Sequence, residues 1–82
     1  MSIELTKLQS LGAHFQGELK LSRQGQHYLV INLGNGNRVR TMYFSKSRTY
    51  KVYLDKGISS STTIGRSVDE TGAKSIIANA IR

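Results

Sequence analysis

The chain has 82 residues, no cysteine and no proline, and 38% of its residues are hydrophobic, which indicates one folded domain over residues 1–82. The missing cysteines exclude disulfides and thiolate metal sites and favour a cytoplasmic location. Twelve Lys and Arg against five Asp and Glu give a formal net charge of +7, which favours a polyanionic partner. No membrane-spanning run of about 18 apolar residues and no signal peptide is recognisable.

The first predicted element is a short helix over residues 2–11. Ser2 is a suitable N-cap, and Glu4 lies in the first turn, where it complements the helix dipole. Leucine recurs at positions 5, 8 and 11, which places three apolar side chains on one helix face. Gly12 then predicts the end of the helix.

From His14 to Asp55 the apolar residues follow a period of two, which predicts an antiparallel sheet of three to four strands. The expected strands cover residues 15–22, 27–33, 38–45 and 48–54. A hairpin turn is expected at Asn35-Gly36, because both residues tolerate positive φ. The third strand has apolar residues on both faces. We expect Met42 and Phe44 to face the core, with the neighbouring arginines at the outer end of the strand.

Residues 56–66 show no clear period, and their serines, threonines and glycines predict a flexible loop. In this loop Arg66 and the hydroxyls are a weak candidate contact for a phosphate. A C-terminal helix follows, with Ser67 and Glu70 as a capping box and apolar residues at helical spacing beyond them. The predicted fold is α+β: an antiparallel sheet with a short N-terminal helix and a C-terminal helix packed on one face, the other face being open to solvent.

No constellation typical of an enzyme is present. His14 and His27 have no partner at metal-ligand spacing, and Asp69 is explained as a residue of the helix start. We therefore expect no catalysis, no cofactor and no metal. The helix–strands–helix order resembles that of double-stranded-RNA-binding domains. The start of the last helix, residues 67–70, is acidic where that family is basic, so the chain is not assigned to the family.

The charges are unevenly distributed along the chain. No acidic residue lies between Glu18 and Asp55, whereas that interval holds seven Lys or Arg. In a nucleic-acid complex, cations neutralise phosphates and aromatic rings stack on bases. The alternative for the tyrosines is ordinary cross-strand pairing. The candidate nucleic-acid-binding residues are these cations and two tyrosines expected on the open face: Lys20, Arg23, Tyr28, Arg38, Arg40, Lys46, Arg48, Lys51 and Tyr53.

The sequence thus favours a non-enzymatic nucleic-acid-binding module that uses an exposed sheet face and the hairpin tips. The alternative is a small accessory or inhibitory protein that docks on an acidic surface of a larger assembly, such as one that processes nucleic acid. Electrostatic steering would serve both partners. A membrane-surface role is disfavoured because the cations lie on strands and not along a helix. Unpaired sheet edges would allow a homodimer.

Overall fold

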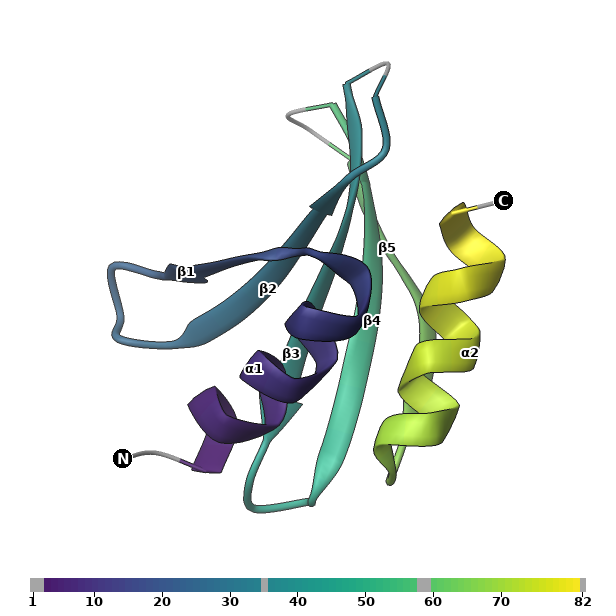
Figure 1. The fold of residues 1–82 in the computed structure, drawn as a ribbon. Helices are drawn as coiled ribbons and strands as arrows, with labels where there is room; N and C mark the ends of the chain where they lie inside the picture. The colour runs from purple at the N-terminus through teal and green to yellow at the C-terminus, as the bar shows by residue number, and fades with distance from the viewer. Residues whose placement is uncertain (1–2, 35, 58–59, 82) are drawn as a thin grey trace.

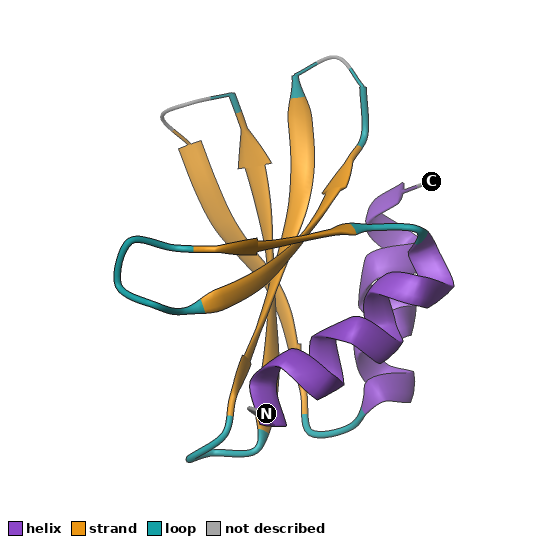
Figure 2. Ribbon diagram, turned by 60° about the vertical axis from the view of Figure 1, so that its left-hand side comes forward, coloured by secondary structure: helices purple, strands orange, loops and turns teal. Residues whose placement is uncertain are grey.

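The computed structural model describes residues 3–34, 36–57 and 60–81. The helices are α1 (Ile3–Phe15) and α2 (Glu70–Ile81). Between them lie the five strands β1 (Glu18–Leu21), β2 (His27–Asn32), β3 (Asn37–Phe44), β4 (Thr49–Lys56) and β5 (Ser60–Ser67). The strands form one antiparallel sheet in chain order, and both helices pack on the same face of it (Figures 1 and 2). The predicted α+β class is confirmed, but the sheet has five strands where three to four were expected.

The fifth strand occupies the segment that the sequence predicts to be a loop. Residues 60–67 pair with β4 over its length, with one register shift opposite Val52 and Tyr53. Residues 60–64 are all exposed, so no buried face imposes the alternation by which a strand is recognised. The backbone groups along the edge of β4 need partners, and β-branched threonines suit a strand. Ser59 lies outside the described residues.

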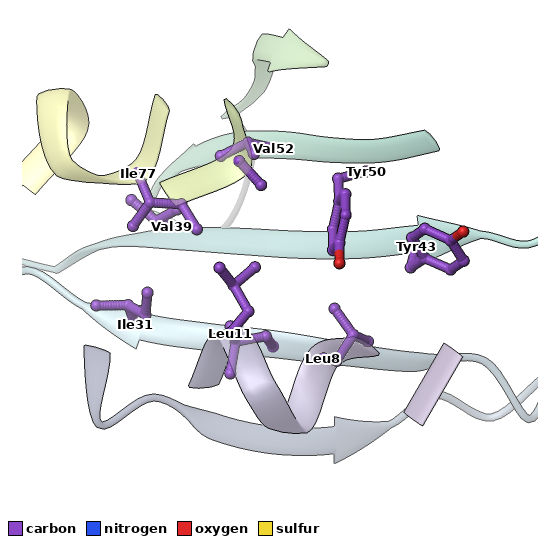
Figure 3. Packing of buried hydrophobic residues seen from close by; sticks show 10 residues of the cluster. Leu8, Leu11, Ile31, Val39, Tyr43, Tyr50, Val52 and Ile77 are labelled. Carbon is purple, nitrogen blue, oxygen red and sulfur yellow. The ribbon is translucent and has the colours of Figure 1, made fainter. Parts of the chain in front are cut away.

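The core lies between the sheet and the two helices (Figure 3). Its buried side chains come from both helices and the three central strands: Leu8, Leu11, Leu29, Ile31, Val39, Tyr43, Tyr50, Val52, Ala73 and Ile77. The hydroxyls of Thr41 and Tyr50 are also buried and have no hydrogen-bond partner among the described residues. In the described ranges neither helix is long and apolar enough to cross a lipid bilayer.

The prediction that Met42 and Phe44 face the core is wrong. Val39, Thr41 and Tyr43 are the buried residues of β3, so the alternate positions lie on the opposite face of the sheet. Alternate residues of a strand point to the same face, so Met42 and Phe44 can face the core only if Arg38 and Arg40 do so too. Burying Met42 and Phe44 would therefore place Arg38 and Arg40 beneath the helices, where two charges would be costly.

The first helix extends four residues beyond its predicted end at Leu11, because Gly12 lies inside the helix as a packing residue. Gly12 is buried, and a Cβ atom there would lie 2.9 Å from Cδ1 of Leu29 in β2. The absence of a side chain allows α1 to approach the sheet closely. The helix ends instead at Phe15. The next residue, Gln16, has a φ of 57°, and the Gly17 N–H donates to the Gly12 carbonyl at 2.9 Å.

The second helix begins at Glu70 and is capped by Asp69. The Asp69 carboxylate accepts a hydrogen bond of 2.8 Å from the Gly72 N–H. Ser67, the predicted N-cap, is the last residue of β5 and is paired with Tyr50. Its hydroxyl accepts a hydrogen bond of 3.2 Å from the N–H of Asp69, which is itself the N-cap, and not from Glu70 as a capping box requires. The predicted capping box is therefore wrong, although its Glu70 does lie in the first turn.

Candidate nucleic-acid interface

The sheet face opposite the helices, the open face, combines cations with aromatic rings. Strand register fixes which residues share it, because directly paired residues lie on the same face. Lys20 is paired with Tyr28, Arg40 with Tyr53, and Lys51 with Arg66. The cations, rings and thioether on this face are Lys20, Tyr28, Arg38, Arg40, Met42, Phe44, Lys51, Tyr53 and Arg66.

Six of the nine candidate residues lie on the open face. They are Lys20, Tyr28, Arg38, Arg40, Lys51 and Tyr53. The other three are exposed in hairpin turns: Arg23 in the β1–β2 turn, and Lys46 and Arg48 in the β3–β4 turn. Antiparallel strand order puts these two turns at the same end of the sheet. Arg38 and Arg40 were expected at strand ends or hairpin tips, but they lie along β3 with their side chains on the face.

Asp55 places a negative charge among the cations of the open face. This carboxylate is 6% exposed, and its Oδ2 atom accepts hydrogen bonds of 3.1 Å from Nε of Arg38 and from Nε of Arg40. Arg38 is the direct partner of Asp55 across the β3–β4 pair, which explains why residues 17 apart in the chain meet. Oδ1 is buried and has no hydrogen-bond partner within the described part of the chain.

The surroundings of Asp55 keep it ionised. Burial would raise the pKa of its carboxyl, but the nearby Ser61 hydroxyl and the guanidinium groups of Arg40 and Arg38 hold the pKa below its usual value. The negative charge in turn orients both arginines. The open face therefore carries two arginines whose positions are fixed by one shared, buried carboxylate.

Arg40 is the most constrained of the open-face cations. Besides its bond to Asp55, Nη2 donates to Oγ of Ser61 at 3.0 Å, and Nη1 lies 3.7 Å from the Met42 sulfur. Its guanidinium group also lies over the Tyr53 ring, 4.5 Å from the ring centroid. A flat guanidinium on an aromatic ring is a favourable cation–π arrangement. These contacts leave the Arg40 side chain 25% exposed and hold its planar group in one orientation.

Met42 and Phe44 belong to this surface, although they were predicted to face the core. The Lys51 ammonium lies 5.1 Å from the centroid of the Phe44 ring, so the lysine partly covers the ring. Arg66 likewise reaches the open face only because β5 is a strand. One feature of the sequence predicts this placement. Met42 and Phe44 occupy the same alternate positions of β3 as Arg38 and Arg40, and burying the four residues together would bury two charges.

A hollow of about 540 Å³ lies in the open face. The β1–β2 turn lines one side of it, including Gln24 and Gln26, and the start of β5 lines the other. Tyr28, Arg38, Arg40, Met42 and Asp55 also line it. The volume is in the usual range of roughly 300–1,000 Å³ for small-ligand sites. Lys20, Lys51 and Arg66 are not among its lining residues.

Among the described residues, no three His, Asp or Glu side chains converge as a possible metal site. No protein-family model, curated protein or solved structure matches the chain. The function is therefore argued from the open face alone.

Proposed function

We propose that the chain is a non-enzymatic module that binds nucleic acid through the open face and the adjoining hairpin turns. The main observation in support is that cations and aromatic rings alternate on the one sheet face that the helices do not cover. The clearest example is Arg40, whose guanidinium carbon lies 4.5 Å from the centroid of the Tyr53 ring. Five cations, Lys20, Arg38, Arg40, Lys51 and Arg66, share this face with two acids, Glu18 and Asp55. The surplus of positive charge favours phosphates, and the rings offer stacking surfaces.

Burial suggests separate roles for these residues. Lys20 and Arg66 are exposed and Lys51 is half-buried, so their charges are accessible to phosphates. Tyr28 and Tyr53 are half-buried, so part of each ring is accessible, which suits contacts with bases or sugars. The three turn cations, Arg23, Lys46 and Arg48, would contact phosphates of the strand where it leaves the sheet.

The test is fluorescence anisotropy with labelled oligonucleotides across a salt series. The double variant Lys20→Ala, Lys51→Ala removes two open-face cations, and we expect the slope of log affinity against log salt to fall by about two. The matched control is Lys74→Ala on α2, where the ammonium pairs with Glu70 at 3.3 Å on the helical side of the molecule. Because Lys74→Ala removes one charge and the double variant removes two, a fall in slope half as large in Lys74→Ala would mean that the net charge, and not the open face, determines binding.

A second candidate function is docking on an acidic protein surface, and the edge strand β5 favours it. Residues 60–64 of this eight-residue edge are exposed, which leaves backbone groups accessible for a partner strand. An apolar hollow of about 310 Å³ lies next to this edge, lined by Leu54, Ile64, Ile76, Asn79 and Ala80.

The two candidate functions predict different effects of nuclease treatment and of a substitution at the β5 edge. Ile64→Lys places a charge at the β5 edge and leaves the open-face cations intact. If the function is protein docking, a partner retained from nuclease-treated lysate should be lost in this variant. If the function is nucleic-acid binding, nuclease treatment itself should remove the captured material, and Ile64→Lys should bind oligonucleotides as the unchanged protein does.

A further inference from the structure

We infer that the open face takes a single strand rather than a duplex, with one unstacked base in the open-face hollow and the phosphates on the flanking cations. This inference rests on the proposed function and deepens it by naming the class of nucleic acid. It follows from how charge is divided between the hollow and its surroundings.

The hollow is less suited to a phosphate than the flanking cations are, because Asp55 offsets one of the two arginine charges in its lining. Arg38 and Arg40 both point into its lining, but each is bonded to Asp55 at 3.1 Å, so a carboxylate lies beneath the two guanidinium groups. An anion placed there would meet the negative charge of Asp55 as well as the arginines. A neutral planar group with donors and acceptors at its edge avoids that repulsion. A nucleobase is such a group.

The lining residues match the edge and the faces of a base. Gln24 and Gln26 each present an amide that both donates and accepts hydrogen bonds, and the arginines present fixed donors. Tyr28 and Met42 supply apolar surface for a flat ring. In a duplex the bases stay paired and stacked, so none is available to enter the hollow. A single strand can turn a base outward for this kind of contact.

The cations outside the hollow form a row that follows a strand backbone. Lys20 pairs with Tyr28, Met42 with Lys51, and Lys51 with Arg66. The β2–β3 register, in which Leu29 pairs with Thr41, brings Tyr28 opposite Met42, so one line of residues crosses the sheet from β1 to β5. Four strand spacings of about 4.8 Å make this row about 19 Å long. None of the three cations in the row lines the hollow. Phosphates of an extended strand can therefore contact the row while a base between them enters the hollow.

The experiment compares labelled single-stranded DNA and RNA 12-mers with the corresponding duplexes by anisotropy. We expect the single strands to bind at least tenfold more tightly than either duplex. Tyr28→Leu should weaken single-strand binding roughly 5- to 150-fold and leave the salt slope unchanged, because stacking releases no counterions. The DNA and RNA arms show which sugar the site accepts.

Gln24→Ala tests the hollow without disturbing the core, since Gln24 is exposed in a turn. It should change the order of affinity among the homopolymers dT, dA and dC, whereas the matched change Gln9→Ala on the exposed side of α1 should not. Equal affinity for single strands and duplexes, with no effect of Tyr28→Leu or Gln24→Ala, would overturn the single-strand inference while the proposed function stood. Absence of salt-dependent binding to every oligonucleotide would overturn both.

Discussion

Arg40 and Asp55 meet on the open face, with 3.1 Å between Nε and Oδ2, although they are 15 residues apart in the chain. The bond joins β3 to β4, and the guanidinium lies over the Tyr53 ring, 4.5 Å from the ring centroid. Asp55 thus lowers the net charge of the surface while it fixes the arginines that the surface presents. Stability and charge at this site are linked through one carboxylate.

Replacing Asp55 separates these two effects. In Asp55→Asn the arginines lose a charged acceptor, and the free energy of unfolding should fall by about 1–3 kcal/mol. Duplex binding should strengthen and its salt slope should steepen, because the open face gains one net positive charge. The preference for single strands should decrease, because the guanidinium groups are less firmly held. Denaturant unfolding and anisotropy measure these changes.

The control for that variant is Asp69→Asn, which makes the same charge change at the α2 N-cap. Asn caps a helix about as well as Asp, so stability should change little. If Asp69→Asn alters duplex binding as much as Asp55→Asn does, the position of the charge on the open face is irrelevant and the proposed geometry is wrong.

The Asp55 pair also predicts a dependence of stability on acid. Although burial opposes it, the combined effect of Ser61, Arg40 and Arg38 keeps the pKa of folded Asp55 below its usual 3.8. Its stabilisation is therefore complete above pH 3.8 and is lost as the pH falls through the lower pKa of the folded state. When the free energy of unfolding is measured between pH 6 and pH 2, it should fall more steeply with decreasing pH for the unchanged protein than for Asp55→Asn. Parallel curves would contradict this.

The orientation of β3 can be tested with two adjacent aromatic residues. Tyr43 is 4% exposed in the core, whereas Phe44 lies on the open face beneath Lys51. Tyr43→Ala should lower the free energy of unfolding by about 3–5 kcal/mol. Phe44→Ala should cost less than half of that but should weaken oligonucleotide binding. Thermal unfolding of the two variants decides the orientation, and a larger loss at Phe44 would reverse it.

Replacing Tyr50 by phenylalanine is expected to stabilise the fold. Its hydroxyl is buried without a hydrogen-bond partner among the described residues, and its ring contacts Tyr43 edge-on at 4.8 Å between centroids. Removing an unsatisfied buried hydroxyl should stabilise the fold by about 1–3 kcal/mol. Tyr50→Phe should therefore unfold at higher denaturant concentration. A loss of stability would indicate that the hydroxyl has a partner.

The same residue predicts a loss of stability in alkali. Burial, assisted by the charge of Glu70, raises the pKa of Tyr50 from 10.0 to about 12. The unfolded chain therefore releases this proton before the folded protein does, and stability falls from about pH 10 to about pH 12. Tyr50→Phe should lose less stability over that interval. Equal alkaline losses in both proteins would contradict the raised pKa.

The sequence predicts much of this fold because its central strands have one buried face. Val52 alternates with Lys51 and Tyr53, and Leu29 and Ile31 have the same parity in β2, so the tyrosines and lysines on the other side follow from this alternation. β5 could not be predicted in this way, since exposed serines and threonines leave no trace of period. Gly12 was misleading because glycine ends helices and also permits close packing, and only the position of Leu29 distinguishes the two uses.

The candidate site was predictable in composition but not in arrangement. All seven cations of the interval between Glu18 and Asp55 lie on the open face or in the hairpin turns beside it. Two facts required the three-dimensional pairing of strands. One is that Asp55, at the end of that interval, lies between Arg38 and Arg40. The other is that the β1–β2 turn lies beside the start of β5 to form the hollow.

The sequential order of the strands has a consequence for folding. Every strand pairing joins chain neighbours, so the sheet is built from local hairpins of low contact order, which favours rapid formation. The helices are different: Leu11 and Ile77 share one core although nearly the whole chain separates them. Closing that long loop is entropically costly. The surface proposed to bind nucleic acid is thus made by local pairings, and the core beneath it depends on the two ends of the chain coming together.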